Sequence, residues 1–167
     1  MEKYQTFFSR IVAYLVDSFI LLPLAILDDW FRQAEFPRLF FYFWLPLSAL
    51  VAPVYRIAMH AAGGQTLGKM ALGVKVLSAD EKLLTLKQAV VRESPQLLIN
   101  FGLVYLGIAF FGADPEAENV KAATAPIAAL VMLWSLVDVL CFLFDIKRRA
   151  LHDFIAGTVV VKANARD

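Results

Sequence analysis

Charged side chains interrupt two apolar stretches of the chain that are long enough to lie in a membrane. Asp17 lies in the first of these stretches, seven residues after Arg10, and Asp138 lies in the last, seven residues before Asp145. A carboxylate at the centre of a bilayer costs roughly 2.5–3.5 kcal/mol on insertion scales. These residues are therefore either paired within the protein or used to bind an ion or a proton.

The composition indicates a multi-pass membrane protein. Of the 167 residues, 60% are hydrophobic, against about 45–50% in soluble domains. Four separate blocks are long enough to cross about 30 Å of hydrocarbon as helices. They are residues 11–27, 39–57, 95–111 and 122–144. The sequence predicts an all-α membrane protein of one domain, residues 1–167, with four transmembrane helices, an inner loop at 60–93 and a tail at 145–167.

Basic residues predict the orientation of these helices. If the N-terminus is cytoplasmic, thirteen Lys and Arg residues fall in the inner segments and three in the outer loops. Cytoplasmic segments of membrane proteins carry such an excess of positive charge. The predicted outer loop at 112–121 is acidic, which fits the same orientation. We therefore expect both termini to be cytoplasmic.

Polar residues of the four predicted helices fall into two layers, because residues seven apart share a helix face nearly two turns apart. The boundary layer contains Arg10, Arg56, Glu93 and Asp145. The deeper layer contains Asp17, Ser48, Asn100 and Asp138. We expect Arg10 to pair with Asp145 at the boundary.

The deeper layer holds two acids and no base. Two carboxylates that share a site of low dielectric constant repel each other when both are charged. Asp17 and Asp138 could therefore hold a proton, bind a cation, or exchange one for the other. In the alternative interpretation each acid is protonated or hydrogen-bonded and only fixes the packing of the helices.

The inner segments show patterns of regular structure. Residues 73–77 alternate as a strand does, and residues 158–161 are the candidate partner strand in a small cytoplasmic sheet. Residues 83–86 could form a further strand. Thr85 and Gln88 match a capping box at the start of an interfacial helix.

The sequence gives little support for a nucleotide-binding, metal-binding or catalytic site. The stretch from Gly63 to Lys69 has the glycine and lysine spacing of a phosphate-binding loop, but Met70 replaces the required Ser or Thr and no strand precedes it. We therefore expect no nucleotide, and no nucleic acid because the net charge is only +1. Two histidines and one cysteine give no metal-ligand cluster. We expect no metal, no cofactor and no enzymatic activity.

Three stretches of the chain resemble the RDD family of bacterial membrane proteins, which is named for one arginine and two aspartates. The first stretch holds Arg10 and Asp17, and the third runs from Asp145 through Asp153 to Val161. The second is a loop motif formed by Gly64, Gln65, Thr66, Gly68 and Lys69, followed by the strand pattern. The resemblance implies that Arg10 and Asp17 are the first two named residues and Asp153 the third. Asp138 is not part of the family pattern.

The resemblance implies a bacterial inner-membrane protein with a role in transport, and exchange of monovalent cations for protons has been suggested for some members. In the first hypothesis Asp17 exchanges these ions with help from Asp138. Four helices can hardly enclose a gated path alone, so we then expect a homo-oligomer. In the second hypothesis the chain is a non-transporting scaffold or assembly module. Its Arg and Asp residues lock the helices, and its inner loops dock a partner.

Overall fold

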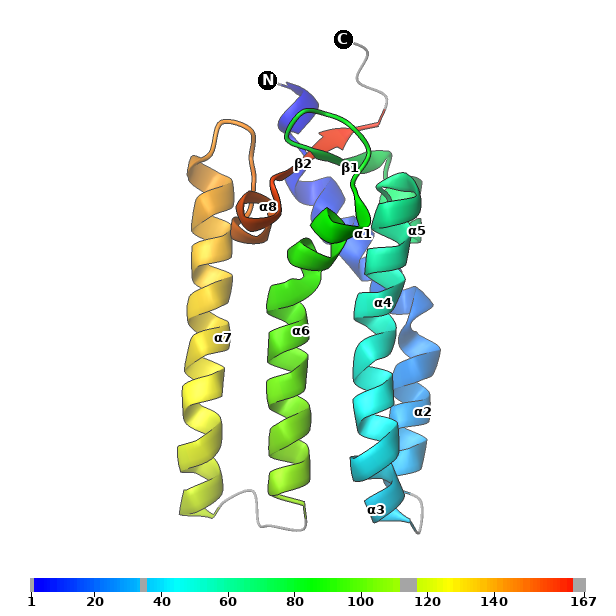
Figure 1. The fold of residues 1–167 in the computed structure, drawn as a ribbon, viewed down its shortest axis with the longest axis vertical. Helices are drawn as coiled ribbons and strands as arrows, with labels where there is room; N and C mark the ends of the chain where they lie inside the picture. Colours follow the sequence, from blue (N-terminus) through cyan, green and yellow to red (C-terminus); the bar gives the residue numbers. More distant parts are fainter. Residues whose placement is uncertain (1, 34–35, 112–116, 164–167) are drawn as a thin grey trace.

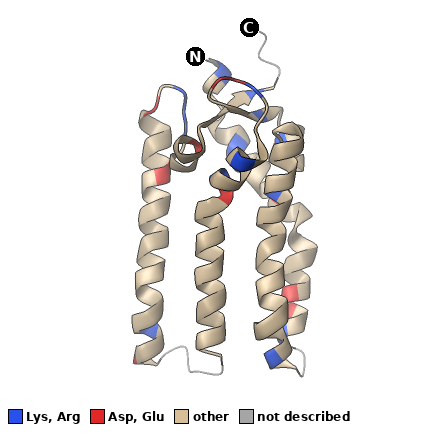
Figure 2. Cartoon of the chain, viewed as in Figure 1, with Lys and Arg blue, Asp and Glu red and all other residues tan. Residues whose placement is uncertain are grey.

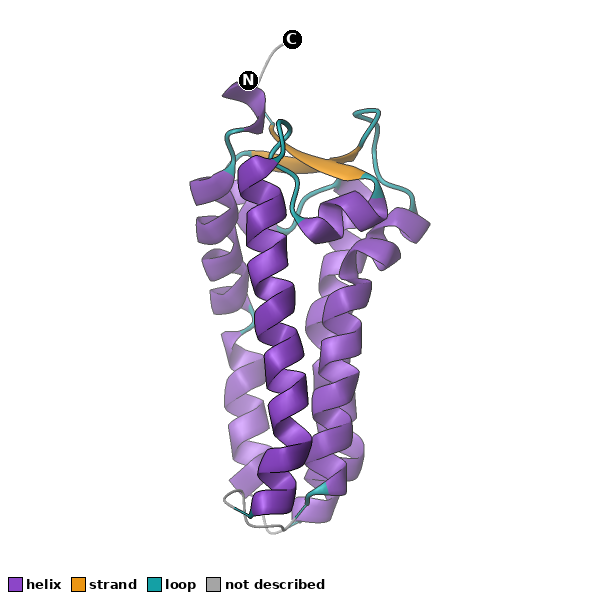
Figure 3. Ribbon diagram, turned by 90° about the vertical axis from the view of Figure 1, so that its left-hand side faces the viewer, coloured by secondary structure: helices purple, strands orange, loops and turns teal. Residues whose placement is uncertain are grey.

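The computed structural model describes residues 2–33, 36–111 and 117–163. The long helices run side by side, and a small sheet caps the bundle at one end, which we call the sheet end (Figures 1 and 3). The short helix η1 (Glu2–Tyr4) lies at this end too. The predicted segments 112–121 and 145–167 extend into residues 112–116 and 164–167, which lie outside the described ranges.

The first predicted span is broken. Helix α1 (Phe7–Ile20) ends before Leu21, and helix α2 (Leu22–Gln33) continues at an angle of 48°. Pro23 lies at the start of α2, where it has no N–H to donate and its ring would clash with the carbonyl of a continuing helix. The proline therefore accounts for a bend within residues 11–27, where a continuous helix was predicted.

The second span forms one helical stretch of 27 residues, Pro37–Gly63. It consists of α3 (Pro37–Leu39), a π-helical turn η2 (Phe40–Trp44) and α4 (Leu45–Gly63). Gly64 ends α4 with a φ of 72°, in the left-handed region where glycine carries no steric cost. The helix therefore extends well beyond residue 57, where the predicted span ended.

Helix α6 (Leu86–Ala109) contains both the predicted interfacial helix and most of the predicted third span. The capping box is confirmed, because the Thr85 hydroxyl accepts the N–H of Gln88 and the Gln88 side chain accepts the N–H of Thr85. Thr85 is therefore the N-cap of α6, and Leu86 is its first residue. The strand considered at residues 83–86 is therefore wrong.

Helix α7 (Glu118–Phe144) is the most apolar of the long helices, with a mean hydropathy of 2.5 over its best 18-residue window. Phe142 is its buried residue, and large side chains such as Leu130, Met132 and Leu136 are exposed. An apolar surface of this extent fits a helix that faces lipid.

The predicted sheet is confirmed. Strand β1 (Val74–Ser78) pairs antiparallel with β2 (Thr158–Lys162), with Val76 opposite Val160. These two valines are fully buried and belong to a core under the sheet that also contains Leu84 and Ala89. The strands are therefore held both by their ladder of hydrogen bonds and by an apolar core.

Two helices of the described residues are long and apolar enough to cross a membrane, Pro37–Gly63 and Glu118–Phe144. The bent pair α1 and α2 makes a third if it counts as one span. Helix α6 does not meet the same criterion, and its first turns carry Lys87, Arg92 and Glu93, which lower its mean hydropathy. The chain is thus mostly helical with two or three candidate spans, and most of its charges gather at the sheet end (Figure 2).

Candidate functional site

Asp17 lies on α1 and accepts hydrogen bonds from three donors. Its Oδ1 accepts from the Tyr55 hydroxyl at 2.9 Å and from the backbone N–H of Gly68 at 2.8 Å. Its Oδ2 accepts from the Thr66 hydroxyl at 2.6 Å. The residue is 8% exposed, and three donors stabilise a buried carboxylate without a bound cation. Asp17 therefore fastens α1 to α4 and to the loop motif.

The loop motif brings the short helix α5 (Leu67–Ala71) directly against α1. Thr66 is the N-cap of α5, where its hydroxyl accepts the backbone N–H of Lys69. A Cβ atom added to Gly68 would lie 2.1 Å from the carbonyl oxygen of Ala13. Only a glycine lets α5 lie this close to α1, and the close contact places the N–H of Gly68 within hydrogen-bond distance of Asp17.

The first residues of the loop motif join it to the sheet. The side chain of Gln65 donates to the carbonyl of Val74 at 3.0 Å, and the carbonyl of Gly64 accepts the N–H of Val76 at 2.7 Å. Lys69 differs from these residues, because its Nζ lies 2.7 Å from Nε2 of His60. Burial lowers the pKa of Lys69 well below its usual value, and the nearby Arg92 lowers it further.

Asp153, on the short helix α8 (Leu151–Ala156), is the most completely enclosed carboxylate of the described residues. Its side chain has no exposed surface and pairs with both Arg10, at 2.8 Å, and Arg92. It also accepts the Thr158 hydroxyl at 3.1 Å and the backbone N–H of Ala150 at 3.0 Å. Two guanidinium groups thus share one buried carboxylate, which joins α1, α6 and α8.

The predicted pairing of Arg10 with Asp145 is wrong. Asp145 pairs instead with Arg149, four residues later, with Nε and Oδ2 at 3.0 Å. Hydrogen bonds from Arg149 are the main reason that the pKa of Asp145 lies below its usual value. The other two residues of the predicted boundary layer do pair, because Arg56 Nε lies 2.7 Å from Glu93 Oε2.

Asp138 is bonded by a histidine. Its Oδ1 lies 2.8 Å from Nδ1 of His152 and also accepts the backbone N–H of His152 at 3.2 Å. The other ring nitrogen, Nε2, lies 3.1 Å from Nη2 of Arg92, which can only donate. The ring is therefore neutral, with its proton on Nδ1. Burial is the main reason that the pKa of His152 is lowered, and Arg92 adds to it, whereas Asp138 opposes it.

The deeper layer does not form a pair of acids in direct contact. Asn100 donates to the carbonyl of Ala49 at 2.8 Å, and Ser48 bonds the carbonyl of Leu45 within its own helix. Asp17 and Asp138 each have the separate partners described above. The layer is thus divided among α1, α4, α6 and α7, and its members bond different elements.

A cavity of about 650 Å³ lies between the helices and joins several of these groups. The lining includes seven charged side chains and one histidine, which are Arg10, Asp17, Arg56, Lys69, Arg92, Glu93, Asp138 and His152, and its uncharged polar residues include Asn100 and Ser135. The lining holds four basic and three acidic side chains, so opposite charges nearly balance. Among the described residues no group of three or more His, Cys, Asp or Glu side chains is placed to hold a metal ion.

The sequence model of the RDD family matches residues 4–157, nearly the whole chain. The chain belongs to the RDD family. It is also similar to the human Protein FAM8A1, with 29% identity over 127 residues that cover 69% of this chain and 25% of that protein. This RDD protein therefore spans about a quarter of the length of that relative. No solved structure matches it.

The three residues that the family resemblance predicts as the named arginine and aspartates, Arg10, Asp17 and Asp153, occupy two separate networks. Arg10 and Asp153 pair directly, although they are 143 residues apart in the sequence. Asp17 lies seven residues further along α1 and bonds the loop motif instead. In this RDD protein the motif residues therefore connect α1 both to α5 and to α8.

Several residues that bond these carboxylates were not predicted as site residues, among them Tyr55, Arg92 and His152. Tyr55 and Arg92 are each adjacent in sequence to a residue that was predicted, Arg56 and Glu93, yet they bond different carboxylates. His152 was part of the family stretch only. A basic residue in the first turns of α6 was the available signal for Arg92, since such a charge needs a partner once it is buried.

Proposed function

We propose that this RDD protein is a membrane transporter or transporter subunit that exchanges protons for a monovalent cation through the interior cavity. In this proposal the chain crosses a bacterial inner membrane four times and keeps both termini in the cytoplasm. The observation that carries the proposal is the cavity itself, where titratable side chains from α1, α4, α6 and α7 face a common space. Ionisable groups placed inside a membrane bundle commonly mark ion pathways.

Asp138 is the better candidate than Asp17 for the exchanging acid. The donors to Asp17 are two hydroxyls and a backbone N–H, none of which titrates near neutral pH. The partner of Asp138 is His152, a titratable side chain whose ordinary pKa lies nearest to neutral pH, although burial lowers that pKa here. Loss or gain of a proton by this pair would alter the charge that the cavity offers to a cation. Glu93 and Asn100 line the same space.

The proposal includes a homo-oligomer in the lipid bilayer. Helix α7 lines the cavity through Asp138 and Ser135, yet most of its other faces are exposed. A second copy packed on α7 would close the cavity on its α7 side. Chemical crosslinking in native membranes tests this part separately from ion exchange.

Proton flux in proteoliposomes tests the exchange. The purified protein is reconstituted with a pH-sensitive dye inside the vesicles, and a sodium or potassium gradient is applied. We expect cation-driven proton movement that Asp138→Asn abolishes. Asp145→Asn is the matched control, because Asp145 follows α7 and bonds Arg149 outside the cavity. Absence of proton movement in the wild type, or full activity of Asp138→Asn, contradicts the proposal.

A scaffold or assembly module is the second candidate, favoured by the complete bonding of Asp17 and Asp153. In this case both acids hold helices together, and the sheet end docks a protein partner. Asp17→Asn would then lower thermal stability, while neither it nor Asp138→Asn would change any flux. Purification of the wild type without a partner after gentle crosslinking would count against this function.

A further inference from the structure

His60 is a buried histidine whose two ring nitrogens have different surroundings. It lies near the end of α4 and is 1% exposed. Nε2 lies 2.7 Å from Nζ of Lys69. Nδ1 has no hydrogen-bond partner within the part of the chain that the structure describes, and it lies 3.9 Å from Oε1 of Glu93. A buried polar atom without a partner is costly, so its position calls for an explanation.

The chemistry of Lys69 fixes the state of the ring. An ammonium group can only donate, so Nε2 of His60 accepts and the proton of the neutral ring is on Nδ1. That proton is on the nitrogen 3.9 Å from Oε1 of Glu93. A side-chain movement of about 1 Å would bring the two atoms within hydrogen-bond distance. Lys69, His60 and Glu93 are therefore arranged in a line of donors and acceptors.

Charged groups from several helices surround this line. Arg56 of α4 bonds Oε2 of Glu93 and leaves Oε1 toward His60. Lys69 is influenced by Arg92 and Glu93 of α6 and by Arg10 and Asp17 of α1. His152 of α8 and Arg92 act on His60 as well. Burial is the largest cause that lowers the pKa of the Lys69 amine, while the two arginines lower it and the two carboxylates raise it, and this burial favours the loss of its proton.

We infer that Lys69, His60 and Glu93 form a relay that passes a proton between Lys69 of the loop motif and Glu93 of α6, two residues that line the interior cavity. The inference rests on the proposed exchange of protons and assigns it a route. Lys69 and Glu93 both line the cavity, whereas His60 does not and instead bridges them from within the protein. Neither His60 nor Lys69 is needed for the bonding of Asp17 or Asp153.

The transfer balances in atoms and charge. An N–H bond of the Lys69 ammonium breaks as a new N–H bond forms at Nε2 of His60. The Nδ1–H bond then breaks, and its proton bonds Oε1 of Glu93. The ammonium has become an amine, the carboxylate has become a carboxylic acid, and the ring is neutral in the opposite tautomer. Glu93 then passes the proton to the cavity, which it lines.

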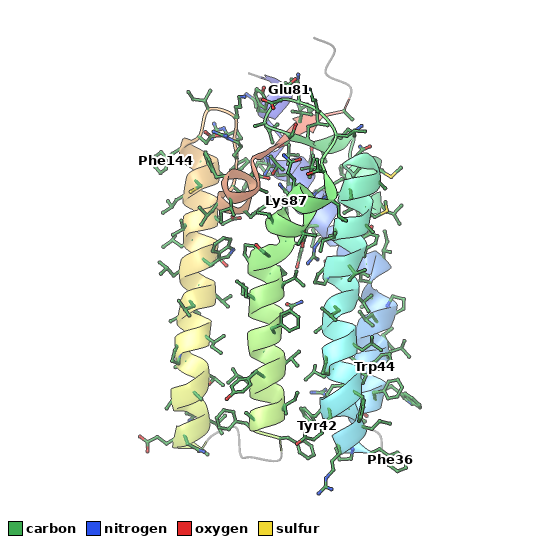
Figure 4. The ribbon with its side chains drawn as sticks, viewed as in Figure 1. Phe36, Tyr42, Trp44, Glu81, Lys87 and Phe144 are labelled. Carbon is green, nitrogen blue, oxygen red and sulfur yellow. The ribbon has the colours of Figure 1, made fainter. Side chains whose placement is uncertain are left out.

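Nitrogen NMR of labelled lysine and histidine side chains, on the full chain in liposomes, tests the relay without a flux measurement. Lys87 is the matched control, since it is exposed near the start of α6 (Figure 4). We expect Lys69 to lose its proton at least about one pH unit below Lys87, a tenfold difference in the amine fraction at a given pH. The His60 ring should change tautomer over the same range. Lys69 titrating together with Lys87, or His60 keeping one tautomer throughout, overturns the relay.

Proton flux in proteoliposomes gives the second arm. His60→Gln keeps a hydrogen-bonding side chain that cannot relay a proton, and Lys69→Arg keeps a charge that does not titrate. We expect both to lower proton flux at least about tenfold, while Lys87→Gln leaves it unchanged. If the wild type exchanges protons and a folded His60→Gln equals it, the relay is wrong and the proposed function stands. If the wild type moves no protons, the proposed function is wrong, and the NMR result decides the relay.

Discussion

The carboxylates on α1 and α8 differ from those at the end of α7 in the groups that bond them. Asp17 and Asp153 accept bonds from hydroxyls, backbone N–H groups and arginines, and they are 8% and 0% exposed. Asp138 bonds a histidine, and Asp145 bonds an arginine in a partly exposed contact. The first two carboxylates are held by groups whose charge is fixed at neutral pH. Of the other two, Asp138 is bonded by a titratable side chain, His152.

The two groups also differ in the distance along the chain that their bonds cover. Asp17 bonds residues 49 and 51 positions later, and Asp153 bonds arginines 61 and 143 positions away. Asp138 and Asp145 bond residues only 14 and 4 positions away. Long-range bonds restrain the relative positions of whole helices, whereas local ones restrain a turn. Asp17 and Asp153 therefore hold helices in place relative to one another, whereas Asp138 and Asp145 are not needed for these long-range connections.

Replacing Asp153 should give the largest loss of stability. Asp153→Asn leaves Arg10 and Arg92 buried without a counter-charge, and breaking a buried pair in this way costs about 3–5 kcal/mol. Unfolding in mixed micelles, followed by circular dichroism, measures the change. Asp145→Asn is the control. An equal loss of unfolding free energy in the two variants would show that Asp153 contributes no more to the packing of the helices than Asp145 does.

Gly68→Ala should cost somewhat less, about 3 kcal/mol, because overpacking forces backbone shifts. The new Cβ would lie 2.1 Å from the carbonyl oxygen of Ala13 and 2.9 Å from Cγ of Asp17. Helix α5 must then move away from α1 and withdraw its N–H from Asp17. Gly63→Ala is the matched control, since its Cβ would meet nothing within 4 Å. Unfolding temperatures that fall equally in both variants would show that the contact of α5 with α1 is not tight.

Local patterns in the sequence predicted local structure well. Alternating residues at 73–77 and 158–161 predicted the two strands, and Thr85 with Gln88 predicted the start of α6. Hydropathy located the long helices but not the bend between α1 and α2. Pro23 barely changes the mean hydropathy of a window, although its missing N–H and its ring interrupt a continuous helix.

Partners were harder to predict than elements. Depth along a helix placed Arg10 level with Asp145, but depth says nothing about which direction a side chain faces around the bundle. The chain after α7 returns through α8, which places Asp153 rather than Asp145 beside Arg10. The family resemblance indicated Asp153, whereas spacing could not. Tyr55 was missed for a similar reason, because neighbouring residues on a helix face directions about 100° apart.

Tyr55→Phe should have the smallest effect among the changes to the networks of Asp17 and Asp153. The hydroxyl donates to Asp17 and accepts the backbone N–H of Leu67 at 3.0 Å. Its removal leaves a backbone donor without an acceptor, which costs about 1–2 kcal/mol. Tyr105→Phe, at an exposed position of α6, is the control and should not change the unfolding temperature. If Tyr55→Phe leaves the unfolding temperature unchanged, the loop motif alone holds Asp17.

Asp145→Asn should give the smallest effect, and one that depends on pH. Hydrogen bonds from Arg149 lower the pKa of Asp145 from its usual 3.8, so folding favours the ionised form. This contribution is fully present above the usual pKa and is lost as the pH falls through the lowered one. The wild type should exceed Asp145→Asn by less than about 1 kcal/mol at neutral pH, as partly exposed ion pairs do. Unfolding temperatures of both proteins from neutral to acid pH should therefore converge only at the acid end. If the difference between the two unfolding temperatures becomes larger in acid, Asp145 bonds its partners in the protonated form. The ion pair of Asp145 with Arg149 would then not contribute to stability.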